Sequence, residues 1–108
     1  MFARTPEPPY WAVIFTSHQI ADEGYASTSA RMEELAREQP GFLGIESARG
    51  EDGLGITVSY WKDLESIRAW KAHAEHRQAQ ANGRKEWYGG YFTRVAKVDY
   101  DYDFAREE

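Results

Sequence analysis

Four hydrophobic runs and two amphipathic segments follow one another along this chain. The first run spans residues 10–15 and reads YWAVIF, aromatic or apolar at every position, after Pro8 and Pro9. A short apolar run bounded by residues that break regular structure predicts a strand covered on both faces.

The two amphipathic segments predict helices. The first is expected to begin at Asp22, a residue type that caps helices, and to run to about residue 39, before Pro40. The second is expected after Asp63, over residues 64–81. The positions that recur near the helical period and should face the core are Tyr25, Ser29, Met32, Leu35 and Ala36 in the first helix and Leu64, Ile67 and Ala74 in the second.

Two runs between these helices predict a hairpin. Residues 42–49 read FLGIESAR, residues 54–61 read LGITVSYW, and the Asp52-Gly53 pair between them favours a tight turn. Because side chains alternate along a strand, the second run places two sets on opposite faces. The apolar set is Leu54, Ile56, Val58 and Tyr60, and the set that is a candidate cavity wall is Gly55, Thr57, Ser59 and Trp61.

The last run, residues 88–100 (YGGYFTRVAKVDY), completes a β-α-β-β-α-β order. This order predicts the α+β class and a ferredoxin-like fold, a four-stranded antiparallel sheet with both helices on one face. We expect one domain over residues 9–100, with residues 1–8 and 101–108 as flexible or partner-contacting termini.

Two helices leave the other sheet face uncovered. The apolar residues on that face need a partner, and a second copy of the same sheet supplies one. We therefore expect a homodimer whose two sheets face each other as a barrel.

Composition narrows the function classes. The 108 residues make one small domain, and a net charge of -5 with 13 Lys and Arg spread along the chain argues against nucleic acid as a partner. The absence of cysteine excludes thiol catalysis and thiolate metal sites. Without a signal peptide or a long apolar span in the sequence, a cytoplasmic location and no membrane partner are expected. Phosphate loops, dinucleotide fingerprints and activated serines are not found.

The stretch WKAHAEHRQAQ, residues 70–80, carries the main candidate chemistry. Trp70 can stack on a flat aromatic ligand or pack the helix against the sheet, and both interpretations stay open. His76 has a side chain whose ordinary pKa, about 6.5, suits proton transfer with a phenol. His73 and His76 are spaced as two metal ligands can be, but no third ligand completes a site, so no metal is expected.

Other residues are candidates for lining a pocket. Thr16 and His18 lie at the end of the first strand, where we expect the mouth of the barrel, and Tyr91 belongs to an aromatic group at the start of the last strand. Trp61 ends the third strand, and His73 lies beside the two catalytic candidates. Each has an alternative role in packing or as a solvated side chain. The same holds for Arg49 and Arg94, which could hold a phenolate or carboxylate.

Three segments resemble the antibiotic biosynthesis monooxygenase (ABM) domain over about residues 9–100. They read PGFLGIES, GITVSYWKDLESIRAWKAHAEH and GRKEWYGGYFTRVAKV, and the pair Trp61 and Trp70, joined by KDLESIRA, is the most specific feature. The resemblance implies a dimeric α/β barrel with one pocket per subunit between the sheet and the helices.

The resemblance implies several functions. Some relatives oxidise phenols, quinols or anthrones with O2 and without metal or flavin, others bind and degrade heme, and many have no established role. We expect a cofactor-independent monooxygenase for a small electron-rich aromatic, with His76 as base and Trp70 as pocket wall. The alternatives are a non-enzymatic ligand-binding barrel of uncharacterised or stress-related role and a heme-binding or heme-degrading protein.

Heme is disfavoured by two departures from the pattern of the heme-degrading relatives. That pattern has an Asn in the first strand, a Trp in the second helix and an axial His ten residues after the Trp. Trp70 matches, but Gln80 occupies the His position, and Thr16 and Ser17 stand where an Asn is expected. An amide is a poor iron ligand, so heme would require His73 or His76 as a substitute.

Overall fold

The structure is a computed structural model that describes residues 2–106, apart from the side chain of Ala74. The expectation of flexible termini at residues 1, 107 and 108 lies outside the described residues. The elements are β1 (Tyr10–Gln19), α1 (Tyr25–Arg37), β2 (Phe42–Arg49), β3 (Leu54–Trp61), α2 (Leu64–Ala72), α3 (Ala74–Asn82), the π-helix η1 (Gly83–Trp87) and β4 (Tyr88–Val98).

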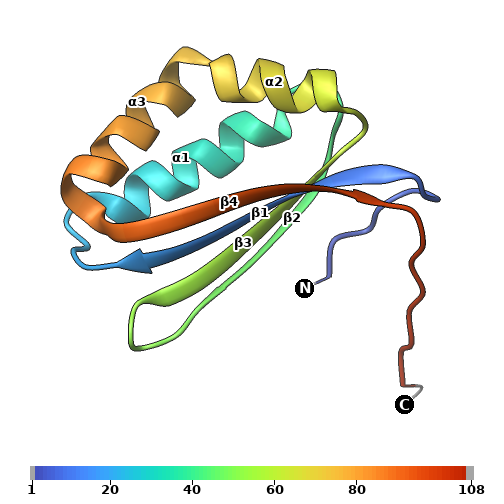
Figure 1. The fold of residues 1–108 in the computed structure, drawn as a ribbon, viewed down its shortest axis with the longest axis horizontal. Helices are drawn as coiled ribbons and strands as arrows, with labels where there is room; N and C mark the ends of the chain where they lie inside the picture. Colours follow the sequence, from blue (N-terminus) through green and yellow to red (C-terminus); the bar gives the residue numbers. More distant parts are fainter. Residues whose placement is uncertain (1, 107–108) are drawn as a thin grey trace.

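The four strands form one antiparallel sheet in the order β2-β3-β1-β4. The three α-helices lie over one face of this sheet, and no helix of the described residues lies over the other face (Figure 1). The predicted ferredoxin-like α+β fold is therefore confirmed. Within the described residues, no helix has the length and apolar character needed to cross a membrane.

The expectation of one continuous second helix is wrong. The helix ends at Ala72 and a new helix begins at Ala74, because His73 between them has an extended backbone with φ -60° and ψ 131°. The His73 ring stabilises the break, since its Nδ1 accepts a hydrogen bond from the backbone N–H of Glu75 at 3.3 Å. The first turn of α2 has the predicted cap, in which Asp63 accepts from the backbone N–H of Ser66 at 2.8 Å.

The start of α1 also differs from the prediction. Gly24 occupies the cap position with a φ of 76° and makes no side-chain cap, so Asp22 does not cap this helix with its carboxylate. The backbone carbonyl of Asp22 accepts instead from the N–H of Tyr25 at 3.0 Å. Glycine suits this position because other residues rarely adopt the left-handed conformation.

Trp61 is the centre of the core. Its side chain is 0% exposed, and its Nε1 donates to the hydroxyl of Ser59 at 2.9 Å. Phe42 packs edge-on against it with ring centroids 5.4 Å apart, and Ala36 from α1 and Ile67 from α2 cover it from the helix side. A tryptophan buried to this extent needs a partner for its N–H, which explains the neighbouring serine.

Gly41 lets the turn before β2 approach α2 closely. Its φ is 84°, and a Cβ built on it would lie 2.7 Å from the Cβ of Ser66. The carbonyl of Gly41 accepts from the N–H of Lys62 at 2.8 Å, which joins the residue before β2 to the residue after β3.

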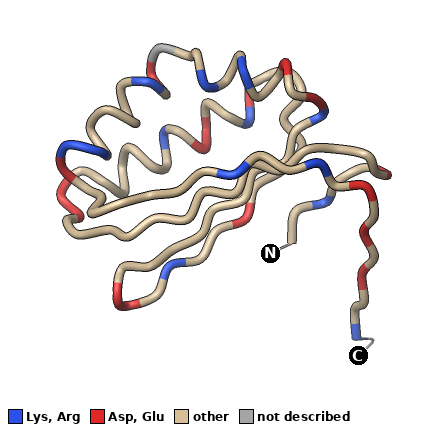
Figure 2. Tube along the Cα trace, viewed as in Figure 1, with Lys and Arg blue, Asp and Glu red and all other residues tan. Residues whose placement is uncertain are grey.

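The face of the sheet without helices, which we call the open face, is covered only at one end. There the backbone N–H of Ala3 donates to Glu46, which also accepts from the hydroxyl of Tyr60 at 2.6 Å. Elsewhere on this face large apolar side chains are exposed: Leu54, Ile56 and Phe92. Figure 2 shows charged residues on the helices, on the turn between β2 and β3 and on the C-terminal segment, while β1 and β3 contain none.

Truncating the central tryptophan should destabilise the protein strongly. Trp61→Ala is expected to lower the free energy of unfolding by about 3–5 kcal/mol, because the change leaves a large cavity beneath two helices. Urea unfolding followed by circular dichroism measures this loss. The neighbouring Lys62→Ala, at an exposed position, should change it by less than about 0.5 kcal/mol. A loss of less than about 1 kcal/mol for Trp61→Ala would contradict the placement of this residue.

Candidate functional site

Trp70 and His76 form a parallel stack at the junction between α2 and α3. Their ring centroids are 4.3 Å apart and their planes differ by 11°. Trp70 also stacks on Trp61, with centroids 6.3 Å apart and an angle of 26°. The last turn of α2 is thereby held against the core, and the first turn of α3 is held against α2.

The break at His73 turns His76 back toward α2. The Nδ1 atom of His76 lies 3.0 Å from the backbone carbonyl oxygen of Trp70. A carbonyl only accepts hydrogen bonds, so Nδ1 carries the hydrogen and the lone pair of the neutral ring is on Nε2. Within residues 2–106, no group forms a hydrogen bond with Nε2. The ring therefore has a fixed tautomer, with the basic lone pair on Nε2.

The environment keeps His76 neutral. Burial lowers its pKa below the ordinary value, and the nearby His73 and Lys71 lower it further, while the hydrogen bond to the Trp70 carbonyl acts in the opposite direction. A histidine that is neutral near pH 7 can accept a proton from a weakly acidic hydroxyl group.

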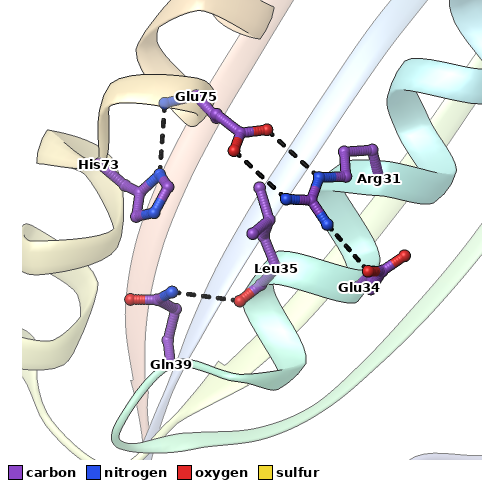
Figure 3. A network of polar contacts seen from close by, with 6 residues as sticks. All are labelled: Arg31, Glu34, Leu35, Gln39, His73 and Glu75. Atoms are coloured by element: carbon purple, nitrogen blue, oxygen red, sulfur yellow. Dashed lines mark hydrogen bonds and ion pairs between the residues drawn. The ribbon is translucent and has the colours of Figure 1, made fainter.

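A polar network connects α3 to α1 directly before His76 (Figure 3). The Nε and Nη2 atoms of Arg31 each lie 3.3 Å from a carboxylate oxygen of Glu75, and Nη1 lies 2.8 Å from Glu34. Glu75 also donates its backbone N–H to His73. These exposed ion pairs add little to stability, so we assign them a role in orienting the start of α3.

Four of the predicted site residues come together at this junction. His73 lies beside Trp70, with ring centroids 5.6 Å apart, although its Nδ1 is engaged as a helix cap. Trp61 lies beneath Trp70 as a core residue. The set comprises Trp61, Trp70, His73 and His76. No group of three His, Asp or Glu side chains in the described part of the chain is placed to hold a metal ion.

The structure does not bring Thr16, His18 and Tyr91 to this site. Trp11 and Val13 pack under the helices, so the even-numbered positions Thr16 and His18 lie on the open face. The exposed ring of His18 lies against the β2–β3 turn, with Nε2 3.1 Å from a backbone oxygen. The expectation that Thr16 and His18 share a pocket with Trp70 is therefore wrong.

Tyr91 is on the helix-covered face, but at its other end. It pairs with Ser17 in the sheet, and its hydroxyl lies 3.0 Å from the Nη1 donor of Arg84. Its ring packs against Phe15, with centroids 5.2 Å apart.

A second polar cluster at this other end was not predicted. Arg49 donates from Nη2 to the hydroxyl of the buried Ser17 at 2.7 Å and to the hydroxyl of Tyr25 at 3.3 Å. The hydroxyl of Tyr88 donates to that of Tyr25 at 3.3 Å, and burial raises the pKa of Tyr88. No ion pair within residues 2–106 includes Arg49.

The pairing of residues across neighbouring strands would have predicted this cluster. Gly55 lies between Arg49 and Ser17 across three neighbouring strands, and a Cβ built on it would lie 2.6 Å from Cζ of Arg49. The guanidinium therefore crosses the sheet above a glycine. The β1 residues that pair with Trp61 and Gly55 are Trp11 and Ser17, six positions apart, so the two ends of the helix-covered face are about 20 Å apart.

Comparison with known proteins gives consistent results. Residues 21–82 match the family described as antibiotic biosynthesis monooxygenase. The uncharacterized protein YqjZ of Bacillus subtilis (strain 168) is 55% identical over 98 residues, which cover 90% of this chain and 86% of YqjZ.

Two solved structures show the same fold. SnoaB, a cofactor-independent oxygenase from Streptomyces nogalater, has a TM-score of 0.70 and 15% identity, over 92% of this chain and 100% of SnoaB. Protein SO0527 from Shewanella oneidensis has a TM-score of 0.74 and 10% identity, over 83% of this chain and 91% of SO0527. At such low identity these two structures are evidence for the fold alone.

Acidification should destabilise the wild-type protein more than His76→Gln between about pH 8 and pH 5. Unfolded His76 binds a proton near its ordinary pKa, whereas the lowered pKa in the fold opposes this, so unfolding takes up a proton. The contribution of His76 is complete above about pH 6.5 and is lost as the pH falls below that value.

Urea unfolding at a series of pH values measures this difference. The pKa of Glu46 is lowered by the hydrogen bond from Tyr60, and the stability from this carboxylate is lost only as the pH falls below its ordinary value of 4.5, outside the measured range. Equal pH dependence in the wild type and in His76→Gln would contradict the buried, neutral state of this ring.

Proposed function

This chain belongs to the antibiotic biosynthesis monooxygenase family, and from this premise we propose that it is a cofactor-independent monooxygenase acting on a small electron-rich aromatic of the quinol, phenol or anthrone type. The observation that carries the proposal is the His76 ring, which is stacked on Trp70 and hydrogen-bonded to its carbonyl with Nε2 free. A neutral base held beside aromatic side chains suits proton removal from a flat hydroxylated ring.

The proposed chemistry uses the substrate itself as the reductant. His76 removes the acidic proton, and the resulting anion transfers electrons to O2 and forms a carbon–oxygen bond. For an anthrone-type CH2 carbon, two C–H bonds are replaced by one C=O bond, the O–O bond breaks, and the second oxygen atom leaves as water. The substrate therefore supplies all four electrons, and the protein supplies the base and an environment that favours the anion.

The relatives support this proposal to different degrees. SnoaB is described as a cofactor-independent oxygenase, which agrees with the absence of a cofactor requirement in the proposed chemistry. YqjZ is uncharacterized, so it supplies no substrate. The substrate class proposed here rests on the chemistry of the stacked rings.

A ligand-binding barrel without chemistry is the second candidate. It is favoured by the mutual packing of Trp61, Trp70 and His76, since rings that stack on one another also serve the core. This candidate differs from the first in a measurable way, because it binds an aromatic compound without consuming O2.

We also propose that the protein is a homodimer in which the open faces of two copies meet. The support is the exposure of Leu54, Ile56 and Phe92 at 53%, 47% and 58% on a face that no helix covers. Apolar side chains grouped in this way mark an interaction surface.

An oxygen electrode tests the proposed reaction. The purified protein, treated with a metal chelator, is expected to consume O2 with one or more members of a panel of quinols and anthrones. His76→Gln should lower kcat/KM about 100-fold, since general-base catalysis contributes about 10²–10⁴-fold. His18→Gln, which changes an exposed ring on the open face, is the matched control and should keep full activity.

Full turnover by His76→Gln would exclude His76 as the base, and saturable binding without O2 uptake would favour the second candidate.

A hemin titration tests the heme alternative. Because Gln80 stands where an axial His is expected, we expect no saturable shift of the Soret band at one hemin per subunit. His73→Ala and His76→Ala are titrated beside the wild type. A saturable shift that one of these variants abolishes would identify the iron ligand and contradict the cofactor-independent assignment.

A further inference from the structure

Residues 99–106, which we call the C-terminal arm, leave the sheet after β4. In Figure 1 the arm runs away from the sheet on the side opposite the helices, which is the side of the open face. Its direction is set near its start, where the hydroxyl of Tyr10 donates to Oδ2 of Asp101 at 2.6 Å. The arm is thus tied to its own β1 at Asp101, and the residues beyond extend from the body of the protein.

Aromatic and acidic residues alternate along this arm. Asp99, Asp101 and Asp103 occupy the odd positions. The even positions hold Tyr100, Tyr102 and Phe104, which are 78%, 85% and 77% exposed. In an extended segment such alternation places the two sets on opposite sides. Because Asp101 faces its own chain, the aromatic side faces away from it.

The aromatic residues of the arm form a surface for packing. The rings of Tyr100 and Tyr102 contact each other, with centroids 5.8 Å apart and an angle of 51°. A single exposed hydrophobic residue needs no explanation, but three at alternate positions beside an exposed apolar sheet face indicate a partner. Within residues 2–106, no part of the same chain buries these three rings.

We propose that the C-terminal arm packs on a second copy of this chain, so that each copy of the dimer holds the other with an aromatic arm. This inference rests on the homodimer proposed above and adds a contact that sheet packing alone does not contain. Facing sheets lie about 10 Å apart, and the six residues from Asp99 to Phe104 can span about 20 Å. The arm is therefore long enough to cross the interface and lie on the partner.

The surface area that the aromatic side chains of the two arms can bury agrees with a role in dimer contact. Each large aromatic side chain buries about 150 Å² or more, so the three residues of both arms together supply about 900 Å². A stable interface buries about 1,600 Å² in total. The arms would then provide a large share of the dimer contact.

The aspartates of the arm argue against negatively charged partners. Three aspartates between the aromatics, in a chain of net charge -5, oppose binding to nucleic acid or to an anionic lipid surface. A second copy requires no such charge match, because two-fold symmetry places each arm on the same apolar surface of the other chain.

The first test is the dissociation constant of the dimer, measured by mass photometry and sedimentation over a dilution series. The triple variant Tyr100→Ser, Tyr102→Ser, Phe104→Ser should raise it about 100-fold or more, since aromatic anchors at interfaces typically cost tenfold or more each. Asp99→Asn with Asp103→Asn, on the other side of the same arm, is the matched control and should change it less than about 3-fold. An unchanged dissociation constant in the triple variant would overturn the arm exchange while leaving the sheet dimer intact.

The second test locates the arm. p-Benzoylphenylalanine is placed at position 102 in the full chain, and ¹⁴N- and ¹⁵N-labelled protein are mixed before irradiation. Mixed-isotope cross-links between the arm and peptides of β3 or β4 are expected. Cross-links confined to a single copy would overturn the proposal, and a wild type that is monomeric at all concentrations would overturn both the arm exchange and the homodimer. Neither result affects the oxygen-uptake test, so the two proposals fail separately.

Discussion

The stacking of Trp70 on the buried Trp61 is the contact on which the candidate site depends. Trp61 is fixed at the end of β3 by the Ser59 hydroxyl and the edge of Phe42, so it forms a rigid base. Trp70 rests on this base from the last turn of α2, and His76 rests on Trp70. The position of the proposed base therefore follows from core packing, which holds a ring more firmly than a solvent-exposed loop does.

The helix break at His73 determines how the His76 ring is oriented on Trp70. A continuous helix would leave His76 on a neighbouring part of the same helix surface, whereas the extended residue lets His76 fold back on the Trp70 carbonyl. That hydrogen bond fixes the tautomer, and partial burial favours the neutral ring. At the other end of the same face, Arg49 lies under α1 without a carboxylate partner among the described residues. The helix-covered face thus carries a neutral base at one end and a cation at the other.

The two faces of the sheet differ in what covers them. Alternate positions of β1 and β3, which contain no charged residue, supply the floor of the site on one side and an apolar surface on the other. Residues 2–9 cover only one end of the open face, over Glu46 and Tyr60. A small domain has few residues for covering both faces of its sheet, which is why we propose that a second copy and its aromatic arm cover the open face.

The sequence by itself determined the order of the four strands, the helical character of the segments between them and the ferredoxin-like class, because these depend on local periodicity and on side chains that are large and apolar. Only the tertiary structure decided where α2 ends, that Thr16 and His18 lie on the open face, and that Arg49 meets Ser17 and Tyr25. The reason is physical: a helix break held by one side-chain cap, the face of a strand and a contact across Gly55 depend on register and on partners distant in the chain, which local patterns do not contain.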